Sequence, residues 1–345
     1  MSADACDGET LQAVRNRIRF RKPPNGLDPL KATTGELADC GIPARPDEAR
    51  TPERHAFWSR FFSGPLHFAD PTFDLPTDPQ PHRIAPQQPR GFGGARRETS
   101  LNWSGAYIRP SGARTFTEIH GEWSVPKPSA PIRPGSSGPA PGQYRCVSFI
   151  GLDGQRRYRN SSLPQIGTAS QVEVDSSGKS TEKVYAWLQW WLRDNSQQET
   201  VITSVPIQPS HVVLCSLVVI SPTKVRFLLK NQTTGYVFGP ADVKAPTPNG
   251  SPQLEVTGAT AEWITERPTA FDAAHTLYEL PDYGKIEFRN CHAVSSSPHF
   301  DEQTETLDLA TVIQMRVIRQ QPHRSVRIST AEITGPQCLT TRYVK

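Results

Sequence analysis

Several classes of protein are excluded by what this chain lacks. The longest apolar run, His211–Ile220, is far shorter than the roughly 18 residues of a membrane-spanning helix and suits a buried strand instead. The segment Met1–Asp7 has neither the basic nor the apolar region of a secretory signal. A net charge of +4 on 345 residues is too small to indicate nucleic acid or an anionic membrane as partner. We expect a monomer that binds neither, located in the cytoplasm or exported by a non-classical route.

The common catalytic and metal-binding motifs are also missing. No GxSxG, HExxH or GxxxxGK[ST] segment occurs, and none of the nine histidines stands four residues from another beside a carboxylate. The six cysteines form no CxxC pair, which argues against a zinc site, and without a secretory signal we expect reduced thiols. The sequence therefore predicts no cofactor and no metal.

The first 98 residues differ in character from the rest. Helical spacing of apolar residues predicts a helix over Glu9–Phe20. A second helix is expected to begin at Thr51, with its hydroxyl as the cap, and to end at Gly64. Pro71–Arg97 is rich in Pro, Gln and Gly and is typical of an extended linker. We predict a partly helical N-terminal extension over 1–98, followed by one domain over 99–345.

After Asn102 the apolar pattern takes the period of two that strands require. The segments with this pattern are separated by turn-rich stretches, and few of them have helical spacing. The pattern predicts an all-β protein, an antiparallel β-sandwich of the concanavalin A-like or jelly-roll type. The expected strands are Phe116–Val125, Cys146–Leu152, Lys183–Leu192, Thr200–Val205, Val212–Ile220, Lys224–Asn231, Thr260–Thr265, Lys285–Asn290, Val312–Ile318 and Arg324–Ile333.

Short, unusual segments fall along these strands in a fixed order. They are NWSGA at 102–106, FIGLDG at 149–154, LPQIGT at 163–168, YAWLQWW at 185–191 and AEWI at 261–264. In order and placement they resemble the glutamic peptidases, the eqolisin family, over roughly Asn102–Asn290. The resemblance implies two antiparallel sheets with a groove across one concave face, polypeptide substrates, and a catalytic dyad matching Gln165 and Glu262.

The chemistry that the resemblance implies is physically sound. A carboxylate, here Glu262, can take a proton from water as general base and return it to the leaving amine. The neutral amide of Gln165 can donate a hydrogen bond to the oxyanion that forms. Because an amide carries no charge, it does not disturb the pKa of its carboxylate partner. An unshifted Glu is ionised only above about pH 4.3, and the family works in acid, so an acidic optimum is also implied.

The resemblance also implies a set of substrate-binding residues. Trp103 and Trp187 match tryptophans that line the family's substrate cleft, and Phe149 stands where the family has a tryptophan. Asp153 matches a residue near the dyad, although it can also serve only to build a turn. Gln189, like Tyr185, stands where the family has an acidic residue, which weakens the case for an acidic optimum. Trp263 follows Glu262 directly, so we expect it to point the opposite way, into the core.

Other functions remain open at this stage. A sandwich that binds peptides or glycans through Trp103, Trp187 and Trp190, without catalysis, would use the same aromatic residues. A glycoside hydrolase needs two carboxylates about 5–10 Å apart, and no second motif carboxylate stands beside Glu262. For the extension, one hypothesis is an inhibitory segment whose basic run from Arg15 to Lys22 pairs with acidic groups at neutral pH. The other is a packed extension or a partly disordered tail.

Overall fold

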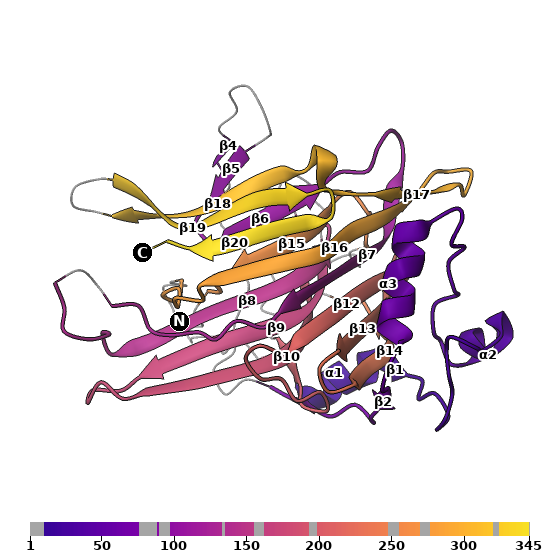
Figure 1. Ribbon diagram of the computed structural model, residues 1–345, viewed down its shortest axis with the longest axis horizontal. Helices are drawn as coiled ribbons and strands as arrows, with labels where there is room; N and C mark the ends of the chain where they lie inside the picture. Colours follow the sequence, from indigo (N-terminus) through magenta and orange to yellow (C-terminus); the bar gives the residue numbers. More distant parts are fainter. Residues whose placement is uncertain are drawn as a thin grey trace, which may run out of the picture.

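The computed structural model in Figure 1 describes residues 10–75, 88–89, 97–132, 135–154, 162–192, 199–247, 255–269, 277–319 and 324–344. The helices are α1 (Leu11–Arg17), α2 (Thr34–Asp39), α3 (Pro52–Phe62) and the 3-10 turn η1 (Leu307–Leu309). The strands are β1 (Ile18–Phe20), β2 (His67–Phe68), β3 (Phe73–Asp74), β4 (Gln88–Pro89), β5 (Arg97–Ser100), β6 (Trp103–Ile108), β7 (Thr115–Ser124), β8 (Gly142–Leu152), β9 (Ser162–Val174), β10 (Ser180–Leu192), β11 (Thr200–Ile202), β12 (Val212–Ser221), β13 (Lys224–Asn231), β14 (Tyr236–Lys244), β15 (Ala261–Glu266), β16 (Lys285–Ser296), β17 (Glu302–Glu305), β18 (Thr311–Arg319), β19 (Arg324–Gly335) and β20 (Cys338–Tyr343).

The strands form two packed layers, as the alternating pattern predicts. The layer that we call the front sheet runs in the order β11, β10, β9, β8, β15, β6, β18. The back sheet runs in the order β17, β16, β7, β12, β13, β14. Strand β16 joins the two, because its first residues pair with β20 of the front layer and its later ones with β7. The main core fills the space between the sheets, and the antiparallel β-sandwich is confirmed.

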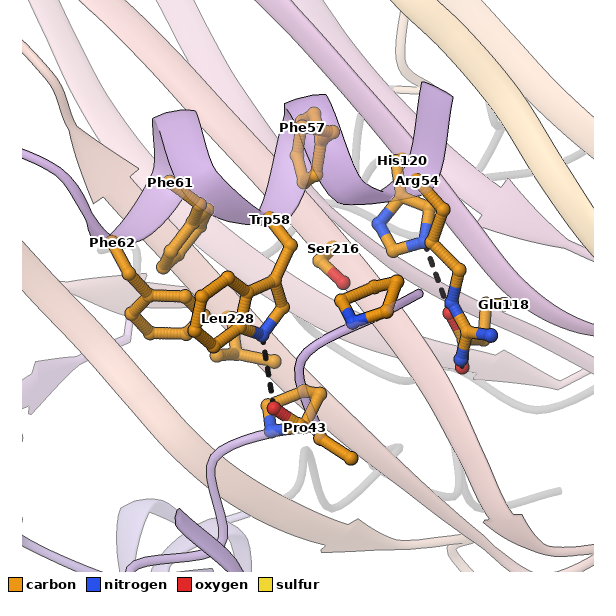
Figure 2. Close-up of a pocket in the computed structure, with 12 residues that line it drawn as sticks. Pro43, Arg54, Phe57, Trp58, Phe61, Phe62, Glu118, His120, Ser216 and Leu228 are labelled. Atoms are coloured by element: carbon orange, nitrogen blue, oxygen red, sulfur yellow. Dashed lines mark hydrogen bonds and ion pairs between the residues drawn. The ribbon is translucent and has the colours of Figure 1, made fainter. Parts of the chain in front are cut away.

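Part of the N-terminal extension, including α3, covers the outer face of the back sheet (Figure 1). Its short strands join the sheets instead: β1 and β2 pair with β14, and β3 pairs with β11. Helix α3 presents Phe57, Trp58 and Phe61 to the outer face, where they cluster with Leu214 and Leu228. Figure 2 shows these rings pointing from the helix toward the strands, with the Trp58 indole donating to the carbonyl of Pro43 at 2.9 Å. The aromatic face of α3 is therefore covered by the sandwich itself.

Charged side chains fix α3 to the same face. Arg54 pairs with the buried Glu118, and its other guanidinium nitrogen lies 2.7 Å from Glu302. Arg60 lies 2.6 Å from Glu122. The Arg54 and His120 partners hold the pKa of Glu118 below its ordinary value, although burial opposes them. Removing one partner of a buried ion pair lowers the free energy of unfolding by several kcal/mol, because the other charge is left buried without a counter-charge.

The N-terminal elements follow the sequence pattern in part. The expected helix over Glu9–Phe20 is shorter, Leu11–Arg17, and the chain then joins β14 as strand β1. Helix α3 stops just before Gly64, as expected, but the Thr51 hydroxyl does not cap it and donates to the carbonyl of Asp47 instead. Within Pro71–Arg97, the described parts are 71–75, 88–89 and residue 97; the rest of the expected linker lies outside the described residues.

Gly167 marks a point where two strands of the front sheet approach closely. A Cβ there would lie 2.0 Å from the carbonyl oxygen of Ser148 and 2.8 Å from the Cα of Phe149, both backbone atoms that cannot move aside. We expect Gly167→Ala to lower the free energy of unfolding by about 3 kcal/mol, measured by urea denaturation. Gly138→Ala is the control, because a Cβ there meets nothing within 4 Å. Equal stability of the two variants would contradict this packing.

Candidate active site

Glu262 and Gln165 lie in one row across the front sheet. On β15, Glu262 pairs with Gly151 of β8, and Gly151 pairs in turn with Gln165 of β9. Gln165 then pairs with Gln189 of β10. Directly paired residues project to the same face of a sheet, so the side chains of this row share one side. The two residues that the resemblance implies as a dyad are therefore neighbours across a single strand.

The residue between them has no side chain. Neighbouring strands are about 4.8 Å apart, so the backbones of Glu262 and Gln165 are separated by roughly 10 Å. Any side chain at Gly151 would stand between the two functional groups. A Cβ there would also approach Leu163 to 2.6 Å. The space beside Gly151 is filled by the side chains of Leu163 and Phe149, so a reactant between the carboxyl and the amide would have to displace Leu163.

The Glu262 carboxyl is held in a dry environment. Its exposed fraction is 0%, and burial raises its pKa well above the ordinary value, with a smaller push from the charge of Asp153. The Thr260 hydroxyl donates to Oε1 of Glu262 and favours the ionised form. The Gly154 backbone N–H also lowers the pKa of this carboxyl, although Oε2 has no partner of full hydrogen-bond geometry among the described residues. A carboxyl whose pKa is moved upward in this way is a candidate for proton transfer.

The Gln165 amide is also buried, with an exposed fraction of 0%. Its Nε2 donates to Oε1 of Gln189 at 2.6 Å, while its own Oε1 has no partner within the described part of the chain. Two buried acceptors, on Glu262 and Gln165, are therefore unpaired on either side of Gly151. A buried polar atom without a partner costs about 1–3 kcal/mol, so these two acceptors call for a functional explanation.

Asp153 acts on the segment that leads into β15. Its carboxylate accepts from the backbone N–H of Thr257, Gly258 and Ala259 and from the Thr257 hydroxyl. Its own N–H donates to the carbonyl of Thr260 at 3.0 Å. These bonds occupy the carboxylate, so the geometry favours a role in positioning the strand of Glu262 over contact with a substrate.

Trp103, Phe149 and Trp187 form one group on the face of Glu262, whereas Trp190, named with them for binding without catalysis, lies in the main core. Trp103 packs edge-on against Phe149 at a centroid distance of 6.0 Å, and Phe149 against Trp187 at 5.9 Å. All three are fully buried. Trp263 lies in the main core on the opposite side, as expected, and its indole donates to the carbonyl of His120. The aromatic group therefore lies beside the row, in a second apolar cluster separate from the main core.

One carboxylate near this face was not expected. The Tyr185 hydroxyl donates at 2.5 Å to Glu199, which is almost fully buried and comes from just before β11. Glu199 has no motif around it, so the sequence gives no signal for this contact. Tyr185 occupies a position where the resembled family has an acid, and here it binds one.

A search for other kinds of site was negative within the described ranges. No group of three or more His, Cys, Asp or Glu residues there is arranged to hold a metal ion. No described helix is long and apolar enough to cross a membrane. Of the six cysteines, the five that are described, all except Cys6, are free thiols.

Comparison with known proteins gives a family match and structures of similar fold. Residues 101–342 match the model of the Peptidase A4 family. The fold is similar to a crystal structure of scytalido-glutamic peptidase with a transition state analog inhibitor: TM-score 0.50, 18% identity, 71% of this chain and 98% of that chain covered. SCP-B, an eqolisin in complex with the tripeptide Ala-Ile-His, aligns with 18% identity and TM-score 0.48 over 71% of this chain and 98% of its own. Aspergilloglutamic peptidase from Aspergillus niger aligns with 19% identity and TM-score 0.42 over 58% of this chain and 99% of its own. A search of curated proteins found no match.

Proposed function

The chain belongs to the Peptidase A4 family of glutamic peptidases, and from this premise we propose that Glu262 and Gln165 carry its endopeptidase activity. The observation that supports the proposal is the row Glu262–Gly151–Gln165, with an unpaired acceptor on each of the two outer residues. We include in the proposal that residues 99–345 form the peptidase domain and 1–98 an extension that packs against it.

In the proposed reaction, a water above Gly151 attacks the scissile carbonyl. Ionised Glu262 takes a proton from that water and later returns it to the leaving nitrogen. The tetrahedral oxyanion accepts a hydrogen bond from the NH₂ of Gln165. Because Gln165 and Gln189 both end in amides, joint rotation of the two side chains keeps their mutual bond and turns this NH₂ toward the substrate.

Trp103, Phe149 and Trp187 form the apolar wall on which substrate side chains pack in this proposal. Asp153 holds the approach to β15, and Gln189 orients the Gln165 amide. All of these side chains are buried, so in this proposal a polypeptide reaches the row only when the side chains packed over it, Leu163 among them, move aside. An extended, unfolded segment is the substrate that fits a row of residues running across a sheet.

The direct test is cleavage of a denatured, reduced polypeptide by the purified chain, followed by mass spectrometry of the products. The incubations span about pH 2 to about pH 7, on either side of the ordinary carboxyl range, with the full chain and with a chain lacking residues 1–98. Absence of cleavage under every condition, with retained binding of the polypeptide, would overturn the proposal and leave the non-catalytic binding module.

The pH profile of this cleavage follows from the environment of Glu262. A general base works only when ionised, and burial raises the pKa of this carboxyl. We therefore expect the rate to increase with pH above about 4.3, the ordinary Glu value, and not to peak in strong acid as the resemblance implies. The measurement is kcat/KM for a peptide without ionisable side chains, so that the titration belongs to the enzyme. A rate that is already maximal below that pH would contradict a buried base.

A further inference from the structure

A concave region lies at the end of the front sheet away from the dyad, where β19 and β5 pair with β18. It is a hollow of about 400 Å³ lined by β5, β18 and β19. Met315 packs in the main core, whereas Gln314 and Arg316 line the hollow, and the Gln314 amide bonds the backbone of Ala331 on β19. Glu98, which also lines the hollow, accepts a hydrogen bond from Tyr107, and Tyr107 pairs directly with Glu262. Because directly paired residues project to the same face, the hollow reaches the side of the sheet that carries the row of Glu262.

The charge in this hollow is unusual for a sheet. Arg316 of β18 and Arg327 of β19 are directly paired across the two strands, and Arg97 lies on the same rim. Like charges at directly opposed positions destabilise a sheet. None of these three guanidinium groups forms an ion pair with a described residue, since the ion pairs of the described chain involve other residues. An anion between them would relieve their repulsion, and guanidinium pairs with carboxylate in a two-bonded geometry.

The hollow is connected to the dyad through one residue. Tyr107 pairs directly with Glu262 on one side and with Thr311 of β18 on the other. Its hydroxyl donates at 3.1 Å to Glu98, which lines the hollow. Arg316 is five residues beyond Thr311 on β18, so it lies roughly 20 Å from Glu262, about the length of six residues of extended chain.

We propose that this hollow is a binding site for carboxylate side chains of the polypeptide substrate, about six residues from the bond that is cleaved. The inference rests on the proposed function. Arg97, Arg316 and Arg327 bind an acidic segment of the substrate, which places the connected chain across the row of Glu262 and Gln165. Glu98 and Glu332 on the rim keep the site from binding anions without selection, because they repel carboxylates placed outside the arginine pair.

The test measures binding directly, by fluorescence anisotropy of labelled peptides on the Glu262→Gln chain, which does not consume them. We expect an oligoglutamate peptide to bind more tightly than its oligoglutamine counterpart near pH 6, by a factor of about 10 or more. The difference should vanish near pH 3, where the peptide carboxyls are protonated. Amidated and free C-termini separate side-chain binding from capture of the terminal carboxylate; preference for only the free C-terminus would overturn the proposal.

Arginine variants assign the binding to the hollow. Arg316→Gln with Arg327→Gln should remove the preference for oligoglutamate, whereas Arg342→Gln, an exposed arginine of neighbouring β20, should keep it. Since the double variant removes a like-charge pair, its melting temperature should not fall. The double variant should cleave a neutral peptide at the same rate as the parent chain. Loss of that cleavage would point to the dyad, whereas loss of only the oligoglutamate preference points to the hollow. A preference retained in the double variant would overturn the proposal.

Discussion

Replacing Glu262 by Gln should abolish cleavage and, at neutral pH, make the protein more stable. The loss of the general base lowers kcat by about 10,000-fold, because Gln keeps the shape of Glu but cannot accept a proton from water. The gain in stability should be roughly 1 kcal/mol, the size of other stabilising substitutions at functional sites. Single-turnover cleavage and chemical denaturation measure the two effects on the same preparation.

The gain in stability must depend on pH in one direction. Burial raises the pKa of Glu262 in the folded chain. Below about pH 4.3 the folded and unfolded chains both hold the proton, so the charge contributes nothing. As the pH rises past that value, the unfolded chain ionises first and the parent protein loses stability, whereas Glu262→Gln does not. The advantage of the variant should therefore grow between that pH and the folded-state pKa.

Glu118→Gln provides the matched control, because this carboxyl is also buried but has the opposite shift. Its ion pair with Arg54 lowers its pKa, so its contribution to stability is present above the ordinary Glu value and is lost as the pH falls. We expect a loss of about 3 kcal/mol at neutral pH that shrinks in acid. Parallel pH dependence of the two variants would show that Glu262 is not held as a buried acid.

Replacing Gln165 by Ala should lower kcat by about 100-fold to 1,000-fold, the usual cost of one oxyanion donor. The oxyanion exists only in the transition state, so KM should change little. Gln171→Ala is the control, since it is the same substitution on the same strand and face, six residues away, at a side chain that donates to Tyr185. Steady-state kinetics on one peptide separate kcat from KM.

Two other results would change the assignment of Gln165. If KM rose and kcat stayed constant, the amide would bind substrate and not the transition state. If Gln171→Ala lost as much activity as Gln165→Ala, the effect would come from disturbance of β9. The loss of kcat in Gln189→Ala should lie between the losses in Gln165→Ala and Gln171→Ala. This variant lets the Gln165 amide rotate but leaves its NH₂ donor in place.

The sequence could name Glu262 and Gln165, but not the strand pairing that places them on either side of Gly151. The sequence motifs name both residues, and the period of two correctly places Trp263 on the other face. An isolated Gln after a proline is typical of a turn, yet Gln165 lies within the long strand β9. Proline has no N–H to donate to a neighbouring strand. Pro164 is tolerated in β9 because the pairing with β8 stops at Gln165, so no hydrogen bond to β8 is lost at Pro164.

Contacts between distant segments explain what the sequence could not predict. The pairing of Arg54 with Glu118, and of Arg316 with Arg327, depends on which strands become neighbours, and single-sequence periodicity does not determine strand order. The bond between Tyr185 and Glu199 has the same origin. Composition distinguishes 1–98 from the rest of the chain. It does not predict where α3 packs, because the outer face of the back sheet forms only when distant strands pair.

The place of β1 and β2 on β14 has a consequence for the solubility of the chain. Strand β14 pairs with β13 on one side, and the other side is covered by β1 and β2 of the extension. A strand with an open edge offers unpaired N–H and C=O groups to any similar strand of another molecule. A form of the protein cut after the extension, if β1 and β2 leave, would join such edges into dimers or aggregates as its concentration rises. In the intact chain, β1 and β2 occupy the edge of β14 where such pairing would start.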